Sequence, residues 1–138
     1  MKKQIRFFTI GLYCFSFCFP VLVCRSQAAQ SKTDSLLVGT WTGSSICQIK
    51  NSPCHDEIVV YHIKKIGTKD SFNIQANKMV NGQEEEMGPV DCKLNRKTNQ
   101  LVSTSYNGIW TFYLKDGKLE GTLVYRGDLY RKISVTKK

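Results

Sequence analysis

The sequence predicts an all-β protein, an eight-stranded antiparallel up-and-down barrel that follows a cleaved signal peptide. From Leu37 onward, short runs rich in Val, Ile, Tyr, Phe, Trp and Thr are separated by turns of Gly, Asn, Asp and Lys, which is the pattern of strands. No useful length of chain beyond residue 28 repeats its apolar residues with the 3.6-residue period of a helix. Closing the meander also removes both exposed strand edges, which otherwise favour aggregation.

The first 28 residues have the three parts of a secretory signal peptide. Three basic residues open the segment, an apolar run follows over residues 7–24, and Ser26 and Ala28 supply the small residues that signal peptidase requires. We therefore expect cleavage after residue 28 and a secreted or periplasmic location. Membrane contact is expected only through the signal peptide before cleavage.

Two alternatives exist for this amino-terminal segment. The apolar run is long enough to stay as a membrane anchor, but Pro20 interrupts it and small residues follow it. Lipidation of Cys24 is disfavoured because Val23 stands where a small residue is normally needed.

The remaining chain has the length of one domain. Residues 29–36 are small and polar, and we expect a short flexible leader there, followed by the barrel domain over residues 37–138. The strongest hairpin signal is Asp116-Gly117, because a two-residue turn of this kind matches the twist of paired strands. The acidic run 84–86 falls between expected strands and is predicted to be a solvated loop. The eight expected strands are Leu37–Ile46, Cys54–Ile66, Ser71–Met79, Met87–Leu94, Gln100–Tyr106, Gly108–Lys115, Lys118–Tyr125 and Leu129–Val135.

The charge of the expected mature chain is moderately basic. Residues 29–138 hold 16 basic and 11 acidic side chains, a net charge of +5 that is spread over the sequence. No long basic block or aromatic-interleaved basic patch is present, so we expect no nucleic-acid partner. The partner is expected to be an unknown small molecule or a protein, and the protein is expected to be a monomer.

Three cysteines remain in the expected mature chain, and outside the cytoplasm they can oxidise. Cys47 and Cys54 enclose six residues, which places them across the mouth of a hairpin turn, and we predict a disulfide between them. Pairing of either one with Cys92 is the alternative. On the first prediction, Cys92 is a buried free thiol that behaves as a small hydrophobic side chain.

The strand alternation sends several aromatic side chains to the interior, among them Trp41, Trp110 and Tyr125. An eight-stranded barrel either fills its interior with side chains or holds one small ligand. A ligand pocket would need polar anchors, for which Tyr61 and Arg131 are the best candidates. The predicted ligand-binding residues are Tyr61, Trp110, Tyr125 and Arg131.

Two motifs resemble the lipocalin and calycin superfamily: Gly39-Thr40-Trp41 on the first expected strand, and the run 129–133 (Leu-Tyr-Arg-Lys-Ile) on the last. The resemblance implies a lipocalin-like barrel in which Arg131 stacks on Trp41 and closes the base by a cation–π contact. The segment around Cys47 and Cys54 also resembles one in small secreted bacterial proteins of unknown function. That second resemblance implies a compartment and a fold, and no activity.

Catalytic and metal-binding motifs are absent from the sequence. His55 and His62, the two candidate general bases, are seven residues apart and face opposite sides of one strand. Because neighbouring strand residues also point in opposite directions, His55, Asp56 and Glu57 cannot converge on a metal ion. We expect no enzyme activity, no metal and no cofactor.

The sequence therefore predicts a secreted, non-catalytic binding module, first for a small apolar or amphipathic ligand. The alternative is an envelope interaction protein or inhibitor with a packed barrel, which binds a macromolecule through the Cys47–Cys54 loop. A small barrel enzyme is the third and weakest possibility. A filled interior beside a rigid, exposed loop would favour the alternative, and a cavity that exposes Arg131 or Tyr61 would favour the first.

Overall fold

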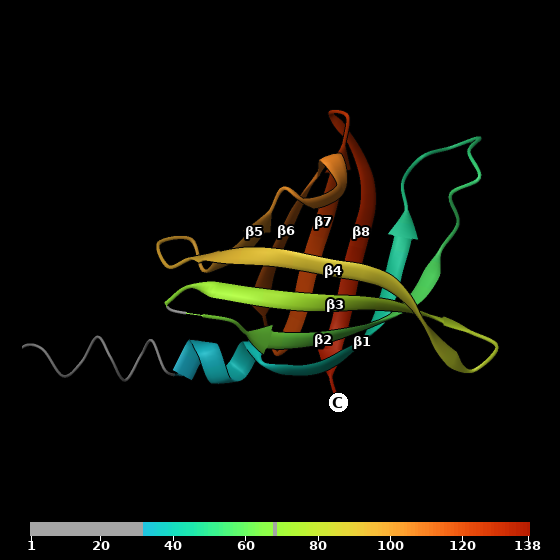
Figure 1. The fold of residues 1–138 in the computed structure, drawn as a ribbon. Coiled ribbons are helices and arrows are strands. Elements are labelled where there is room, and N and C mark those ends of the chain that lie inside the picture. The colour runs from blue at the N-terminus through green and yellow to red at the C-terminus, as the bar shows by residue number, and fades with distance from the viewer. Residues whose placement is uncertain (1–31, 68) are drawn as a thin grey trace, which may run out of the picture.

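The structure is a computed structural model, and it describes residues 32–67 and 69–138 (Figure 1). The predicted signal peptide, residues 1–28, lies outside the described residues. Among the helical segments of those two described ranges, none has the length and apolar character to cross a membrane. The strands are β1 (Gly39–Cys47), β2 (Glu57–Lys65), β3 (Ser71–Val80), β4 (Gln83–Asn95), β5 (Gln100–Ser103), β6 (Gly108–Lys115), β7 (Lys118–Tyr125) and β8 (Asp128–Lys137), with a 3₁₀ turn η1 (Ser105–Asn107) before β6.

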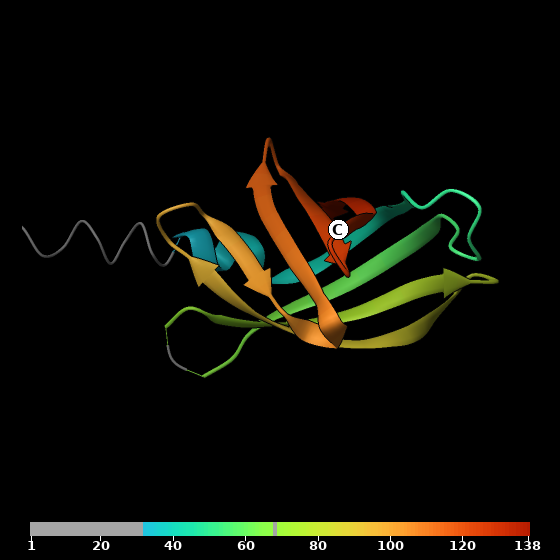
Figure 2. The ribbon, with the colours of Figure 1, turned by 90° about the horizontal axis from the view of Figure 1, so that it is seen from above.

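Each strand pairs antiparallel with the next, and β8 pairs with β1, so the sheet is a closed eight-stranded barrel. This confirms the predicted fold class. Figure 1 shows β2, β3 and β4 running across the barrel while β6, β7 and β8 stand nearly upright behind them, and Figure 2 gives the same steep crossing from above. At the β6–β7 turn both Asp116 and Gly117 have positive φ (50° and 76°), as the two-residue hairpin requires.

The up-and-down order divides the chain connections between two ends of the barrel. One end, called the loop end below, carries the segments 48–56, 81–82, 104–107 and 126–127. The opposite end, called the base, carries the segments 66–70, 96–99 and 116–117. Figure 1 shows the segment 48–56 as a long loop that projects from the barrel at the loop end.

The acidic run 84–86 corrects one expectation, because it lies within β4 rather than in a loop. Asn81 and Gly82 have φ values of 51° and 81°, so they form a turn tight enough for pairing to resume at once between Val80 and Gln83. Cross-strand contacts then hold the acidic residues in the sheet, including an ion pair of 3.3 Å between Lys78 Nζ and Glu85 Oε2.

One apolar cluster fills the interior of the barrel. Phe112 is only 1% exposed, meets the Tyr61 ring edge-on at 5.9 Å between centroids, and packs over Gly121 on the neighbouring strand. A Cβ atom at position 121 would lie 2.4 Å from Phe112 Cδ1, so this position has room only for glycine. The largest side chains buried to below 2% exposure include Trp41, Tyr61, Phe72, Phe112, Ile63, Ile74, Leu101 and Leu119.

A helix over residues 32–37 covers the base. Its Leu37 joins the core at 3% exposure, and the Trp41 Nε1–H donates to the Leu37 carbonyl at 2.9 Å. Asp34, 8% exposed, accepts from Lys65 Nζ and from Arg96 Nη2, the latter at 2.7 Å.

The prediction of a flexible leader over residues 29–36 is therefore wrong for residues 32–36, while residues 29–31 lie outside the described ranges. Tertiary contacts order the helix over residues 32–37: Leu37 packs into the core, and Asp34 binds Lys65 and Arg96 from distant parts of the chain. The ion pairs also change the acidity of the Asp34 carboxylate. Burial raises the pKa of Asp34, but the hydrogen bonds and charges of Lys65 and Arg96 outweigh that effect and hold the pKa below its usual value.

Candidate functional site

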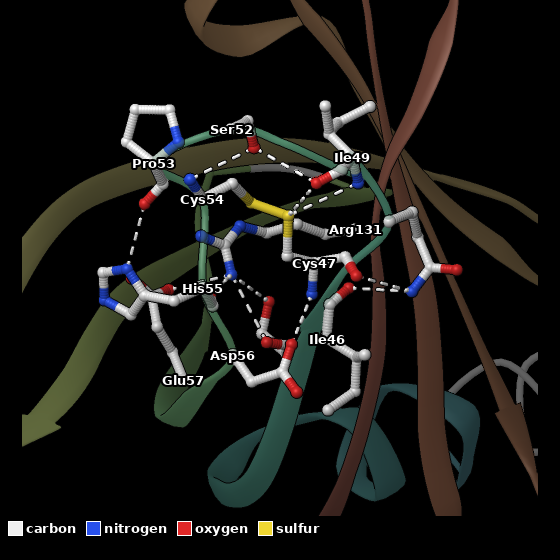
Figure 3. The surroundings of a disulfide bond; sticks show 12 residues. Ile46, Cys47, Ile49, Ser52, Pro53, Cys54, His55, Asp56, Glu57 and Arg131 are labelled. Atoms are coloured by element: carbon white, nitrogen blue, oxygen red, sulfur yellow. Dashed lines mark hydrogen bonds and ion pairs between the residues drawn. A yellow bond between two sulfur atoms is a disulfide. The ribbon is translucent and has the colours of Figure 1, made fainter.

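The Cys47–Cys54 loop is braced from inside. Cys47 and Cys54 form the predicted disulfide, with their Cα atoms 5.9 Å apart, and Figure 3 shows it crossing the neck of the loop. Within the loop, Ser52 Oγ donates to the Ile49 carbonyl at 3.1 Å and accepts from the Cys54 N–H at 3.2 Å. Cys92 is free and buried, so the alternative pairings do not occur.

The same loop is also tied to the barrel. The Cys47 N–H donates to Asp56 Oδ1 at 2.9 Å, which joins the two sides of the neck. The Gln48 N–H donates to the Tyr130 carbonyl at 3.0 Å, which continues the pairing between β1 and β8 by one further bond. These two bonds fix the neck of the loop to Asp56, next to β2, and to β8, while the tip of the loop remains in contact with solvent. The exposed residues of the segment are Lys50, Asn51, Pro53, His55 and Asp56.

Arg131 lies beneath this loop and ties it to the barrel interior. Its Nη1 lies 3.1 Å from Glu57 Oε2 in an ion pair. The same nitrogen donates to the Ser45 carbonyl, to Ser45 Oγ and to the His55 carbonyl, each at 3.3 Å (Figure 3). Only 13% of the Arg131 side chain and 15% of the Glu57 side chain are exposed, so this pair is screened far less than a surface ion pair.

Tyr61 reaches the same layer of the interior from β2, where it follows Glu57 and Val59 on the inward face. Burial raises the pKa of its hydroxyl, the positive charge of Arg131 lowers it, and Glu57 raises it again. The net effect is a pKa well above the usual value for tyrosine, so the phenol stays protonated and can donate a hydrogen bond.

The other two residues predicted to bind a ligand lie toward the same end. Trp110 is half-buried, and its Nε1–H is occupied by the Ser105 carbonyl at 3.2 Å. Tyr125 meets Tyr130 at 5.9 Å between ring centroids, and the Arg131 guanidinium lies 5.6 Å from the centre of the Tyr130 ring. Arg131, Tyr125 and Tyr130 thus form a connected aromatic and cationic group at the loop end.

Tyr130 is not among the predicted ligand-binding residues, because strict alternation places it on the opposite face from Arg131. In the structure the register shifts between Leu123 and Val124, which pair with Arg131 and Leu129. Tyr130 is left without an opposite residue, as in a β-bulge, and the strict alternation of faces is broken there. A bulge of this kind leaves no signal in a period-two pattern, so the position of the Tyr130 ring could not be predicted from the sequence.

The predicted closing contact between Trp41 and Arg131 is wrong. Trp41 pairs with Lys137 across β1 and β8, whereas Arg131 pairs with Cys47, six residues further along β1. The cation above Trp41 is Lys137, whose Nζ lies 5.7 Å from the ring centre and also donates to the Leu36 carbonyl at 3.0 Å. Lys137 therefore closes the base, and Arg131 belongs to the loop end.

A second polar group lies on the outer face of the sheet. Thr40 Oγ1 is 3.1 Å from His62 Nδ1, His62 Nε2 is 2.7 Å from Glu84 Oε2, and Asn77 Nδ2 donates to the same oxygen at 2.7 Å. Hydrolytic triads have the same order of hydroxyl, imidazole and carboxylate. Here, however, His62 and Glu84 are 34% and 35% exposed, whereas triads act in sites that exclude water. We interpret the group as a polar network that joins β1 to β4.

The remaining candidate groups are separate from one another. His55 sits on the exposed loop before β2, with its Nδ1 3.1 Å from the Pro53 carbonyl, so it does not share a strand with His62, contrary to the expectation. Burial raises the pKa of the Cys92 thiol to about 12, with a smaller contribution from Asp91, so this thiol is inert. Within residues 32–67 and 69–138, no group of three or more His, Cys, Asp or Glu side chains could hold a metal ion.

Comparison of the chain with protein-family models, with curated proteins and with solved structures found no match. The closed eight-stranded antiparallel barrel is consistent with the lipocalin-like fold that the two short motifs resemble.

Proposed function

We propose that the protein is a secreted or periplasmic, non-catalytic binding protein that holds a protein partner at its loop end. The observation that carries this proposal is the contrast between a filled interior and a braced, solvent-exposed loop. Trp41, Tyr61, Phe72 and Phe112 occupy the barrel at 2% exposure or less. This supports the packed-barrel alternative over a carrier that encloses a small ligand.

The loop has the properties of a recognition element. Its disulfide and its hydrogen bonds to Asp56 and Tyr130 hold the backbone in place before binding, so little conformational entropy is lost when a partner docks. Two large apolar side chains flank it, Ile46 at 38% and Ile58 at 61% exposure. They supply apolar area that a partner would remove from water.

The charge favours a partner with an acidic surface. Residues 29–138 carry a net charge of +5, and Lys50 at the loop tip is exposed. Lys132, which pairs with Ile46 across β1 and β8, is also exposed. Positive side chains around a recognition surface speed association with an acidic protein and discriminate against a basic one.

The secreted or periplasmic location rests on two observations. The sequence opens with the parts of a signal peptide, and a disulfide of this kind persists where thiols are oxidised.

The test is capture of partners from the extracytoplasmic fraction of the native host with immobilised protein. A matched pair of variants decides the outcome: Lys50→Glu reverses a charge at the loop tip, and Lys115→Glu makes the same change at the base. We expect one acidic protein to be retained by the wild type and by Lys115→Glu, and to be lost with Lys50→Glu. Equal capture by all three proteins, or capture lost only with Lys115→Glu, would refute a site at the loop end.

A further inference from the structure

Arg131 holds unused hydrogen-bond donors although it is largely buried. All four of its polar contacts with the described residues involve Nη1, which faces Ser45, His55 and Glu57. A guanidinium carries five N–H groups in a planar fork, so the three N–H groups on Nε and Nη2 have no partner in this part of the chain. Figure 3 shows these two nitrogens without contacts beside the disulfide.

Tyr61 adds a fourth unused donor. Its side chain is 2% exposed, and its hydroxyl has no hydrogen bond to any described residue. In the same described ranges, no side-chain nitrogen or oxygen that is shut off from solvent lacks a partner. The hydroxyl oxygen and the unused nitrogens of Arg131 therefore each keep some contact with solvent, although the Tyr61 residue is only 2% exposed and the Arg131 side chain only 13%. We call these three groups, Arg131 Nε, Arg131 Nη2 and the Tyr61 hydroxyl, the donor site.

The surroundings fix the donor site and set its charge. Ser45 and the His55 carbonyl hold the guanidinium from one side, and the Tyr130 ring lies 5.6 Å from it. Glu57 neutralises Arg131 at 3.1 Å, so the pair has no net charge. A bound anion would gain attraction from Arg131 and lose it again to repulsion from Glu57. An uncharged hydrogen-bond acceptor avoids that repulsion and still meets donors that are already oriented.

From these observations we infer that the donor site binds peptide carbonyl oxygens of the protein partner, as the centre of the contact surface at the loop end. This inference rests on the proposed function and specifies its chemistry. A planar fork with two adjacent N–H directions can donate to the closely spaced carbonyl groups of an exposed turn or extended segment, and the Tyr61 hydroxyl, which the charge of Arg131 reaches, supplies a further donor. The flanking apolar and basic residues then form the rim of the contact.

The first test uses N-methylacetamide, a neutral amide, titrated into ¹⁵N-labelled protein while the Nε–H signal of Arg131 is followed by NMR. The signal is assigned by its loss in Arg131→Lys, which retains a positive charge for Glu57. We expect a saturable shift in the wild type and a dissociation constant about fivefold higher in Tyr61→Phe, the effect of one lost hydrogen bond. Tyr113→Phe is the matched control, because Tyr113 lies exposed on β6, and it should leave the constant unchanged.

Acetate at equal ionic strength distinguishes an anion site from a carbonyl site. Tighter binding of acetate than of N-methylacetamide, or the absence of any saturable shift at the Arg131 signal, would overturn the inference. The captured partner separates the two proposals. A partner that is lost with Lys50→Glu but is held equally by the wild type and Tyr61→Phe would leave the proposed function standing and refute the carbonyl contact. Amide binding that depends on Tyr61, with no partner captured, would retain the donor site and refute the proposed function.

Discussion

Removing the Cys47–Cys54 disulfide should lower the free energy of unfolding by an amount that the loop length sets. The two cysteines are separated by seven positions, and the chain-entropy relation for a closed loop of that size gives about 2.4 kcal/mol at 25 °C. For a domain of about 100 residues, a loss of this size lowers Tm by roughly 10 °C. The double variant Cys47→Ser/Cys54→Ser tests this without leaving an unpaired thiol in the loop.

The assay is urea unfolding of the wild type and the double variant, with linear extrapolation to water and comparison of the two m values. Most of the lost free energy of unfolding should come from a less restricted unfolded chain. The NMR signals of the folded barrel should therefore be unchanged outside residues 46–57. A free energy of unfolding within about 0.5 kcal/mol of the wild type would refute the reasoning. It would mean that the bonds of Gln48 to Tyr130 and of Cys47 to Asp56 already hold the loop without the disulfide.

Three further predictions concern the barrel. Gly121→Ala should lower the free energy of unfolding by about 1–3 kcal/mol because its Cβ would meet the Phe112 ring, and urea unfolding should show a smaller loss in a Phe112→Leu background. Asp34→Asn should destabilise the wild type near pH 7. Since the folded pKa of Asp34 is lowered, its contribution is present above the unfolded pKa and is lost as pH falls through the folded pKa; thermal melts from pH 7 to pH 2 that show a constant difference between the two proteins would contradict this. Cys92, with its pKa raised to about 12, should not react with a thiol reagent at pH 8 until the protein unfolds, and fast labelling of folded protein would disprove its burial.

The strand pattern was predictable because short-range chemistry determines it. Gly108–Lys115 and Lys118–Tyr125 were expected with the bounds that β6 and β7 have, since Asp116 and Gly117 can both adopt positive φ. The disulfide was predictable for the same reason, because a hairpin brings Cys47 and Cys54 opposite one another. Bounds were less certain where a turn could be shorter than expected, as at Asn81-Gly82.

The long-range contacts were not predictable from the same signals. Arg131 was assigned to Trp41 by resemblance, but the actual partner of a strand residue depends on register, and the register of β1 with β8 places Lys137 there. Likewise, nothing local marks Asp34 as buried, because its partners Lys65 and Arg96 are 31 and 62 residues away in sequence. A composition that is small and polar therefore indicated a leader where the structure has a helix.

The two ends of the barrel differ in how their polar groups are satisfied, and this difference is the reason for proposing a binding site at the loop end. At the base, Asp34 is shared by Lys65 and Arg96, and Lys137 donates to carbonyls of the covering helix. Charged groups there serve internal contacts. At the loop end, Arg131 uses one nitrogen for the fold and leaves two without a partner among the described residues. A mostly buried arginine with unused donors stabilises the barrel less than a fully paired one would, and the proposed partner would give those donors a role that folding does not.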